Sequence, residues 1–238
     1  MTEAPEALRE AVQREALRGL AVPAGAQKTL SPWLFYDERG SELFEQITRL
    51  PEYYLTRSER AIFEQFGSEI VSEGTGPLTI ADLGAGTATK TGILLRAALK
   101  RQAELLYQPI DVSASALDEA VASLSEISGL AIKPRVANYI TDAFTIERTR
   151  EQSVLALYIG SSIGNFSPSE ATAILRNLRK QLRRTGDSLL LGVDLAPCRN
   201  KSVEFLLAAY DDAEGVTSEF NLNILTRLNH DLQTNFDL

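Results

Sequence analysis

The strongest indication of the fold lies in residues 78–91, Leu78-Thr79-Ile80-Ala81-Asp82-Leu83-Gly84-Ala85-Gly86-Thr87-Ala88-Thr89-Lys90-Thr91. An apolar run ends in two glycines and a helical pattern follows, which predicts a buried strand, a tight turn and a helix. Glycine at positions 84 and 86 allows a ligand to approach the backbone where a side chain would block it. The alternative is an ordinary strand-to-helix turn, because such turns also need glycine.

The spacing of this loop disfavours a dinucleotide. The fingerprint G-x-G-x-x-G requires a third glycine where this sequence has Thr89, so a pyrophosphate site is not expected. An acidic residue before the glycines, Asp82, suits a ligand that carries an amine or a sulfonium, such as S-adenosylmethionine.

Composition excludes several classes of protein. The net charge of −8 over 238 residues argues against a nucleic-acid-binding surface, which normally has a basic face. One cysteine and one histidine make a Cys/His metal site implausible, so no metal is expected. No stretch approaches the roughly 18 apolar residues of a membrane span, and the N-terminus lacks the features of a signal peptide. We therefore expect a cytoplasmic protein with no membrane partner.

Strands and helices alternate after the glycine loop, which predicts an α/β fold with a doubly wound parallel sheet. The further strands are expected at residues 106–111, 132–139, 154–160 and 188–194. Two helices are expected to begin with capping boxes, at Thr56 to Glu59 and at Ser167 to Glu170. The first of them is expected to bury Ile62, Phe63, Phe66 and Ile70; Ser115 and Asp118 are expected to cap the helix after the second strand.

Ligands of such sheets bind beyond the carboxyl ends of the strands. Asp111 closes the second strand and suits either ribose hydroxyls or a helix cap. Asn138 and Tyr139 could contact and stack on an adenine, or they could be turn residues. The loop from Gly160 to Phe166 could present donors to a substrate, or its glycines could serve only the turn.

The two ends of the chain differ from this alternating region. A helix is expected over residues 4–20, and the aromatic run from Trp33 to Tyr36 is interpreted as a core anchor rather than a lid over a ligand. After Asp194 the pattern predicts helices over 202–212 and 224–232. His230 is expected to be a solvated helix residue, and Cys198 is expected to have no role as a nucleophile.

Taken together, these motifs resemble the histidine Nα-methyltransferases of ergothioneine biosynthesis, which use S-adenosylmethionine to trimethylate the α-amine of histidine. The resemblance rests on Phe35-Tyr36-Asp37, on residues 47–57 (Ile-Thr-Arg-Leu-Pro-Glu-Tyr-Tyr-Leu-Thr-Arg), on the glycine loop, and on residues 111–112, 160–166, 186–192 and 209–212. It implies a Rossmann-like methyltransferase sheet over residues 58–195. A second, smaller substrate-binding domain would be built from residues 1–57 and 196–238.

The resemblance also assigns roles to residues. Gly84, Lys90, Asp111, Asn138 and Tyr139 would contact the cofactor, and Gly86 would help to fix it. Tyr53, Asn165 and Tyr210 would hold the carboxylate and the amine of the amino acid, and Tyr36 would lie near the amine as the catalytic residue. The implied product is the trimethyl betaine, hercynine.

Two departures from the family pattern stand out. Asn138 occupies a position where the family usually has an acid. The family closes its sheet with two more strands and reads the imidazole with residues beyond the position of Leu238, so we expect this chain to lack the C-terminal part of the family. The alternatives are an α-N-methyltransferase of another amino acid, a nicotinamide oxidoreductase, which Thr89 disfavours, and a cofactor-binding protein without turnover. Nothing in the sequence suggests an obligate interface, so a monomer is expected.

Overall fold

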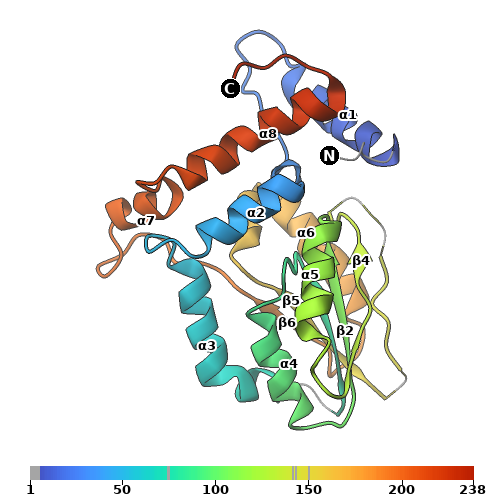
Figure 1. Cartoon of the computed structure of the whole chain (residues 1–238). Coiled ribbons are helices and arrows are strands. Elements are labelled where there is room, and N and C mark those ends of the chain that lie inside the picture. Colours follow the sequence, from blue (N-terminus) through green and yellow to red (C-terminus); the bar gives the residue numbers. More distant parts are fainter. Residues whose placement is uncertain (1–5, 74–75, 141, 143, 150) are drawn as a thin grey trace. The chain divides into compact units, whose positions relative to one another are not determined.

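The computed structural model describes residues 6–73, 76–140, 142, 144–149 and 151–238, and the chain forms two compact units (Figure 1). The larger unit is Tyr53–Val203. The smaller unit combines Met1–Glu52 with Glu204–Leu238. No helix among the described residues is long and apolar enough to cross a membrane.

A parallel sheet forms the centre of the larger unit, as the sequence predicts. Its strand order is β3-β2-β1-β5-β6, β4 also pairs with β2, and every pair is parallel. The strands are β1 (Leu78–Leu83), β2 (Leu105–Asp111), β3 (Leu130–Ile132), β4 (Arg135–Val136), β5 (Ser153–Tyr158) and β6 (Ser188–Leu191).

Helices cover both faces of the sheet. Strands β1 and β5 are predominantly apolar, and every residue of both strands is buried. One face packs Ile80 and Leu157 with residues of α3 (Leu55–Ile70), α4 (Thr91–Leu99) and α5 (Ala114–Leu124). The other face packs Ala81 and Ala156 against α6 (Pro168–Gln181). The doubly wound arrangement is therefore confirmed.

The third predicted strand is wrong in its extent. Instead of one strand over residues 132–139, the structure has the short β3 and β4 with Lys133 and Pro134 between them. Proline has no N–H to donate to a ladder, so the pairing with β2 is interrupted there. Asn138 and Tyr139 consequently lie in the loop that follows β4.

Two of the predicted helix caps are also wrong. Helix α3 begins at Leu55, before Thr56, and makes no side-chain capping bond, so the box from Thr56 to Glu59 does not form. Ser113 caps α5, since its hydroxyl accepts from the Ala116 N–H at 3.3 Å. The capping box at Ser167 is confirmed.

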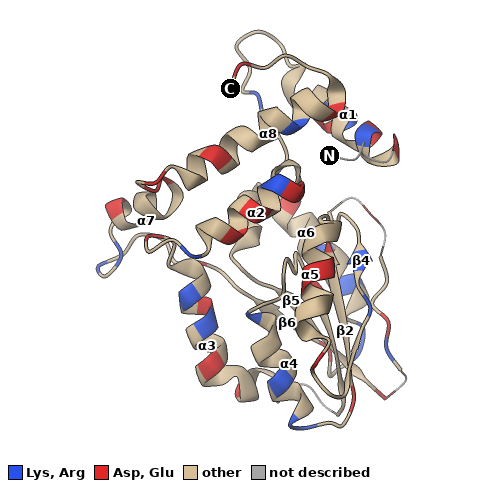
Figure 2. Cartoon of the chain, in the orientation of Figure 1, with Lys and Arg blue, Asp and Glu red and all other residues tan. Residues whose placement is uncertain are grey.

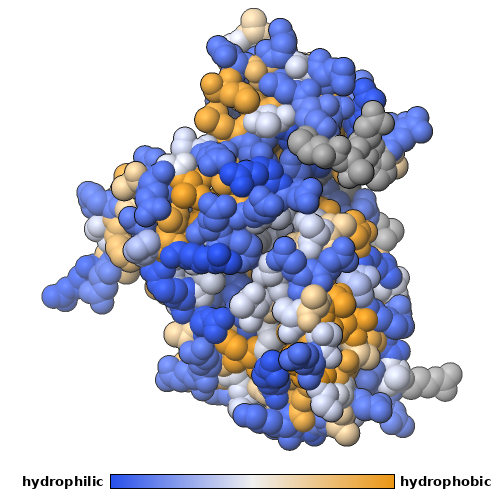
Figure 3. All heavy atoms as spheres, in the orientation of Figure 1, coloured by the Kyte–Doolittle hydropathy of each residue, from blue (hydrophilic) through white to orange (hydrophobic). Residues whose placement is uncertain are grey.

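The two arginines of α3, Arg57 and Arg60, lie in its first half, and Glu64 and Glu69 lie in its second half (Figure 2). Phe63 is buried as predicted, but the side chains of Ile62 and Phe66 are 49% and 42% exposed, so their predicted burial is wrong. Hydrophilic residues cover most of the face drawn in Figure 3, with apolar patches between them.

The smaller unit is helical. It consists of α1 (Glu6–Leu20), η1 (Pro32–Phe35), α2 (Glu38–Ile47), α7 (Val203–Tyr210), whose first residue belongs to the larger unit, and α8 (Val216–Leu232). Leu34 is fully buried in a cluster with Val12 and Leu228, and the ring of Phe35 stacks on Phe220 with centroids 4.8 Å apart. The aromatic run is thus a core anchor of this unit.

Candidate functional site

The loop after β1 is held in a conformation that needs glycine. Gly84 and Gly86 have φ angles of 70° and 53°, and the Gly84 N–H donates to the carbonyl of Ile110 at the end of β2 (2.8 Å). A Cβ on Gly84 would lie 3.6 Å from the Tyr139 ring, whereas a Cβ on Gly86 would meet nothing within 4 Å. The backbone at Gly86 is therefore open to a ligand.

Asp111 lies beside this loop. One carboxylate oxygen accepts from the Gly86 N–H and the other from the Ser113 N–H, both at 2.9 Å. Burial raises the pKa of Asp111, and these backbone hydrogen bonds oppose that shift. Each carboxylate oxygen can accept a second hydrogen bond, so Asp111 can still receive two hydroxyl groups.

Asp82 is buried, whereas a carboxylate that contacts a ligand would have to be accessible. Its side chain is fully buried, and Oδ2 accepts from the hydroxyls of Thr91 (2.8 Å) and Tyr107 (3.0 Å). Oδ1 accepts no hydrogen bond from any residue that the structure describes. Burial raises the pKa of Asp82 to about 6.

Asn138 makes the local bonds of a turn. Its Oδ1 accepts from the Ile140 N–H at 3.0 Å, and its own N–H donates to Asp142 at 2.8 Å. The Tyr139 ring meets Tyr158 edge to face with centroids 5.6 Å apart, and it lies against the position of Gly84. Tyr139 is therefore next to the glycine loop, while the amide oxygen of Asn138 already has one donor.

Lys90 has a partner that the sequence analysis missed. Its ammonium forms an ion pair with Glu59 of α3, and the other carboxylate oxygen of Glu59 accepts from the Gly160 N–H at 2.8 Å. Glu59 escaped notice because it completes a capping-box pattern with Thr56. The sequence carries no local signal of this contact, since Glu59 and Gly160 are 101 residues apart.

A second missed cluster follows β6. Asp194 accepts from the hydroxyl of Tyr54 and from the ammonium of Lys201, both at 2.5 Å. Burial raises the pKa of Asp194, but the hydrogen bonds from Lys201 and Tyr54 outweigh it and leave this pKa below its usual value. The Tyr54 hydroxyl therefore lies at the carboxyl ends of the strands. Tyr53, the neighbouring residue, is buried and only 6% exposed.

The loop after β5 is held at its first two residues. Glu59 binds the Gly160 N–H, and the Ser161 hydroxyl accepts from the Asp194 N–H at 3.0 Å. Ser161 has a φ of 59°, a conformation uncommon for a residue with a side chain. The loop continues into η2 (Ser162–Asn165), where Asn165 is exposed.

The predicted site residues are divided between the two units. Tyr53, Asn165 and all predicted cofactor residues belong to the larger unit. Tyr36 and Tyr210 belong to the smaller one, where Tyr36 packs edge to face on Phe44 and Phe220, and Tyr210 is 50% exposed.

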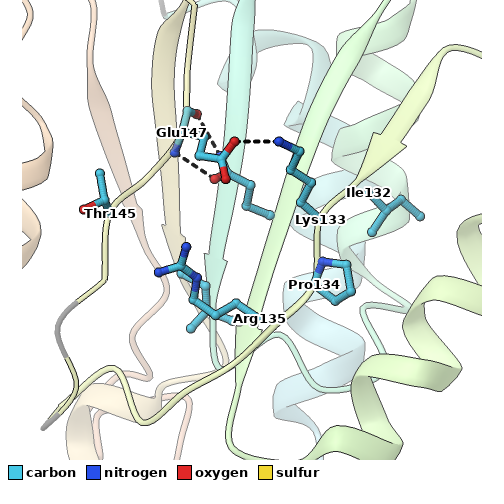
Figure 4. A pocket seen from close by; sticks show the side chains of 8 residues that line it. Ile132, Lys133, Pro134, Arg135, Thr145 and Glu147 are labelled. Carbon is cyan, nitrogen blue, oxygen red and sulfur yellow. Dashed lines mark hydrogen bonds and ion pairs between the residues drawn. The ribbon is translucent and has the colours of Figure 1, made fainter.

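A pocket of about 380 Å³ also lies on the larger unit (Figure 4). Lys133 and Glu147 face each other there and form an ion pair at 2.6 Å. None of the predicted site residues is among its lining residues, which are Gln108, Ile110, Ile132, Lys133, Pro134, Arg135, Thr145 and Glu147. Within the described part of the chain, no group of His, Cys, Asp and Glu side chains is arranged to hold a metal ion.

Comparison with known proteins identifies the family. The family model of the S-adenosylmethionine-dependent histidine-specific methyltransferases matches residues 12–238. The histidine N-alpha-methyltransferase of Mycolicibacterium smegmatis is 41% identical over 99% of this chain and 70% of its own length, and that of Mycobacterium tuberculosis is 40% identical over 91% and 66%. Ergothioneine biosynthesis protein 1 of Schizosaccharomyces pombe is 33% identical over 82% of this chain and 26% of its own length.

The chain thus spans about two thirds of the length of its two mycobacterial relatives. Because the family model covers nearly all of the sequence, the chain belongs to the family of S-adenosylmethionine-dependent histidine-specific methyltransferases.

Proposed function

We propose that this protein transfers methyl groups from S-adenosylmethionine to the α-amine of L-histidine and yields hercynine, as a step of ergothioneine biosynthesis. Family membership and the 41% identity to a histidine N-alpha-methyltransferase support the reaction and the substrate. The observation that carries the proposal is the contact between Asp111 and Gly86, which joins a strand-end carboxylate to an open glycine loop.

The residues present fit this cofactor, which supplies an electrophilic methyl group. Asp111 retains acceptor capacity for the two ribose hydroxyls, and Gly84 and Gly86 leave the backbone accessible. Tyr139 is the proposed stacking partner of the adenine, with Asn138 at its amine. Lys90 is the proposed cation of the cofactor site, held by Glu59.

Transfer to an amine mostly requires that the reactants be positioned, so neither a histidine nor a cysteine is needed for acid–base work. Asn165, Tyr53 and Tyr210 are the proposed contacts of the carboxylate and amine of histidine. The exposure of Asn165 on a loop held at two points supports its role, whereas the burial of Tyr53 leaves little of its side chain accessible. Tyr36 is the proposed catalytic residue, with its hydroxyl as a relay for the proton that the amine must lose.

The two units supply a basis for the proposed domains. We assign cofactor binding to residues 58–195 and substrate binding to the segments 1–57 and 196–238. The compact units divide at Tyr53 and Val203 instead, because Tyr54 and Lys201 both bond to Asp194 of the larger unit. We also propose a cytoplasmic monomer that acts on a small molecule; the charge of −8 supports the absence of a nucleic-acid partner.

The test is mass spectrometry of an amino-acid panel incubated with the purified chain and S-adenosylmethionine. We expect mono-, di- and trimethylated histidine to appear in succession. Methylation of a different amino acid would refute histidine as the substrate and keep the methyltransferase. No product from any amino acid, despite cofactor binding, would refute the proposed activity of this chain.

A further inference from the structure

Glu59 is the one residue of α3 whose carboxylate reaches two separate loops at the carboxyl ends of the strands. One oxygen pairs with the ammonium of Lys90, at the start of α4, and the other accepts from the Gly160 N–H at 2.8 Å. The side chains of Glu59 and Lys90 are only 13% and 22% exposed. An ion pair shielded to this degree is screened less by solvent than a surface pair, so it holds its geometry more firmly.

The surrounding backbone leaves room for this carboxylate. A Cβ on Gly192, just after β6, would lie 2.3 Å from the Glu59 oxygen that binds Gly160, and 3.0 Å from the Cα of Ile159. A side chain at position 192 would therefore crowd the Glu59 carboxylate in its present position next to Gly160. Glu59 has no part in capping its own helix, since α3 begins at Leu55 and makes no side-chain cap.

The loops that Glu59 joins belong to the two halves of the proposed site. Lys90 closes the glycine loop on the cofactor side. Gly160 opens the loop that ends at Asn165 on the amino-acid side. Because Ser161 holds a φ of 59° directly after Gly160, that loop depends on its neighbours to keep its shape.

We propose that Glu59 is a positioning residue that couples the cofactor half of the site to the amino-acid half, through Lys90 on one oxygen and Gly160 on the other. This inference rests on the proposed function for the identity of the two ligands. It predicts that the Glu59 oxygen bound to Lys90 and the oxygen bound to Gly160 can be tested separately for their effects on the affinities of the two ligands.

Two substitutions at Glu59 separate them. Glu59→Gln keeps a carbonyl oxygen for the Gly160 N–H but removes the charge that holds Lys90. Glu59→Ala removes both partners. Glu64→Gln is the matched control, because Glu64 lies on the same helix in an exposed pair with Arg60 and touches neither loop.

The experiment is calorimetric titration of the full chain with S-adenosylhomocysteine, and then with histidine at saturating S-adenosylhomocysteine. We expect Glu59→Gln to weaken S-adenosylhomocysteine roughly tenfold, the effect of having to order one long side chain on binding, and to change histidine affinity less than about threefold. Glu59→Ala should weaken both ligands by roughly tenfold. Glu64→Gln should match the wild type.

Gly192→Ala provides a second test, since it changes neither Glu59 nor Lys90 in the sequence but should displace the Glu59 carboxylate from its position next to Gly160. It should weaken both ligands as Glu59→Ala does. The proposal would be overturned if Glu59→Gln and Gly192→Ala bound both ligands with the same affinities as Glu64→Gln. It would also be overturned if these variants lowered the melting temperature but left both affinities unchanged. A wild-type chain that binds S-adenosylhomocysteine but methylates no amino acid would refute the proposed function, and the S-adenosylhomocysteine titrations would still decide the role of Glu59.

Discussion

Asp82→Asn should change the free energy of unfolding, relative to that of the wild type, more favourably at neutral pH than at acid pH. Asp82 is fully buried near the end of β1, and its carboxylate accepts hydrogen bonds from two hydroxyls, with no cation in direct contact among the described residues. An ionised carboxylate in such a place is costly, which is why burial raises its pKa from 3.8 to about 6. Asparagine has nearly the same shape and no charge.

The magnitude follows from proton linkage. Below the unfolded pKa both states are protonated, and between 3.8 and about 6 the folded state keeps a proton that the unfolded state has lost. The stability that the neutral carboxyl contributes is therefore present at low pH and lost as the pH rises through about 6. The full effect is roughly 3 kcal/mol, and most of it, roughly 2 kcal/mol, falls between about pH 4 and about pH 8.

Urea unfolding of the wild type and Asp82→Asn at these two pH values measures the effect. The free energy of unfolding of the variant, minus that of the wild type, should be larger at the higher pH by roughly 2 kcal/mol. The new amide N–H, placed where Oδ1 has no partner among the described residues, lowers stability equally at both pH values and cancels from this comparison. Asp118→Asn, at an exposed position of α5, is the control. A difference that does not change with pH would refute the reasoning.

Three further predictions concern the site and the core. Asn165→Ala should weaken histidine at least about tenfold while changing cofactor affinity little, because Asn165 is exposed and outside the glycine loop; equal losses in calorimetry would contradict its assignment. Gly84→Ala should lower the melting temperature and cofactor affinity together, since a φ of 70° strains alanine by roughly 1 kcal/mol or more; unchanged cofactor binding would argue against the loop as the cofactor site. Leu157→Ala should cost roughly 2–5 kcal/mol in urea unfolding, because Leu157 is fully buried in the middle of the sheet; a loss below about 1 kcal/mol would contradict its place in the core.

The sheet could be predicted from the sequence because its signals are local. Strands β1 and β5 are predominantly apolar, which is the pattern expected of strands that are buried on both faces. The same holds for the capping box at Ser167, where both partners lie within one turn. The break in the third strand was also visible in principle, since Pro134 cannot donate to the ladder.

The links between loops could not be predicted, because their partners are far apart in the sequence. Thr56 and Glu59 have the spacing of a capping box, yet Glu59 bonds instead to Gly160, 101 residues away. The bond from Tyr54 to Asp194 spans 140 residues. Exposure of Ile62 and Phe66 likewise depends on which neighbours reach α3, and helical spacing alone does not fix that.

The division of the proposed site between two units has a consequence for how affinity can be altered. All the proposed cofactor residues belong to the larger unit, and so does Glu59, which joins Lys90 to the loop after β5. Tyr36 and Tyr210 belong to the smaller unit, whose core is formed by residues from both ends of the chain. Substitutions at Tyr36 or Tyr210 should therefore leave S-adenosylhomocysteine affinity unchanged and reduce only the binding or turnover of the amino acid. Glu59→Ala should differ from these substitutions, because it removes the contacts to both Lys90 and Gly160 and should weaken both ligands.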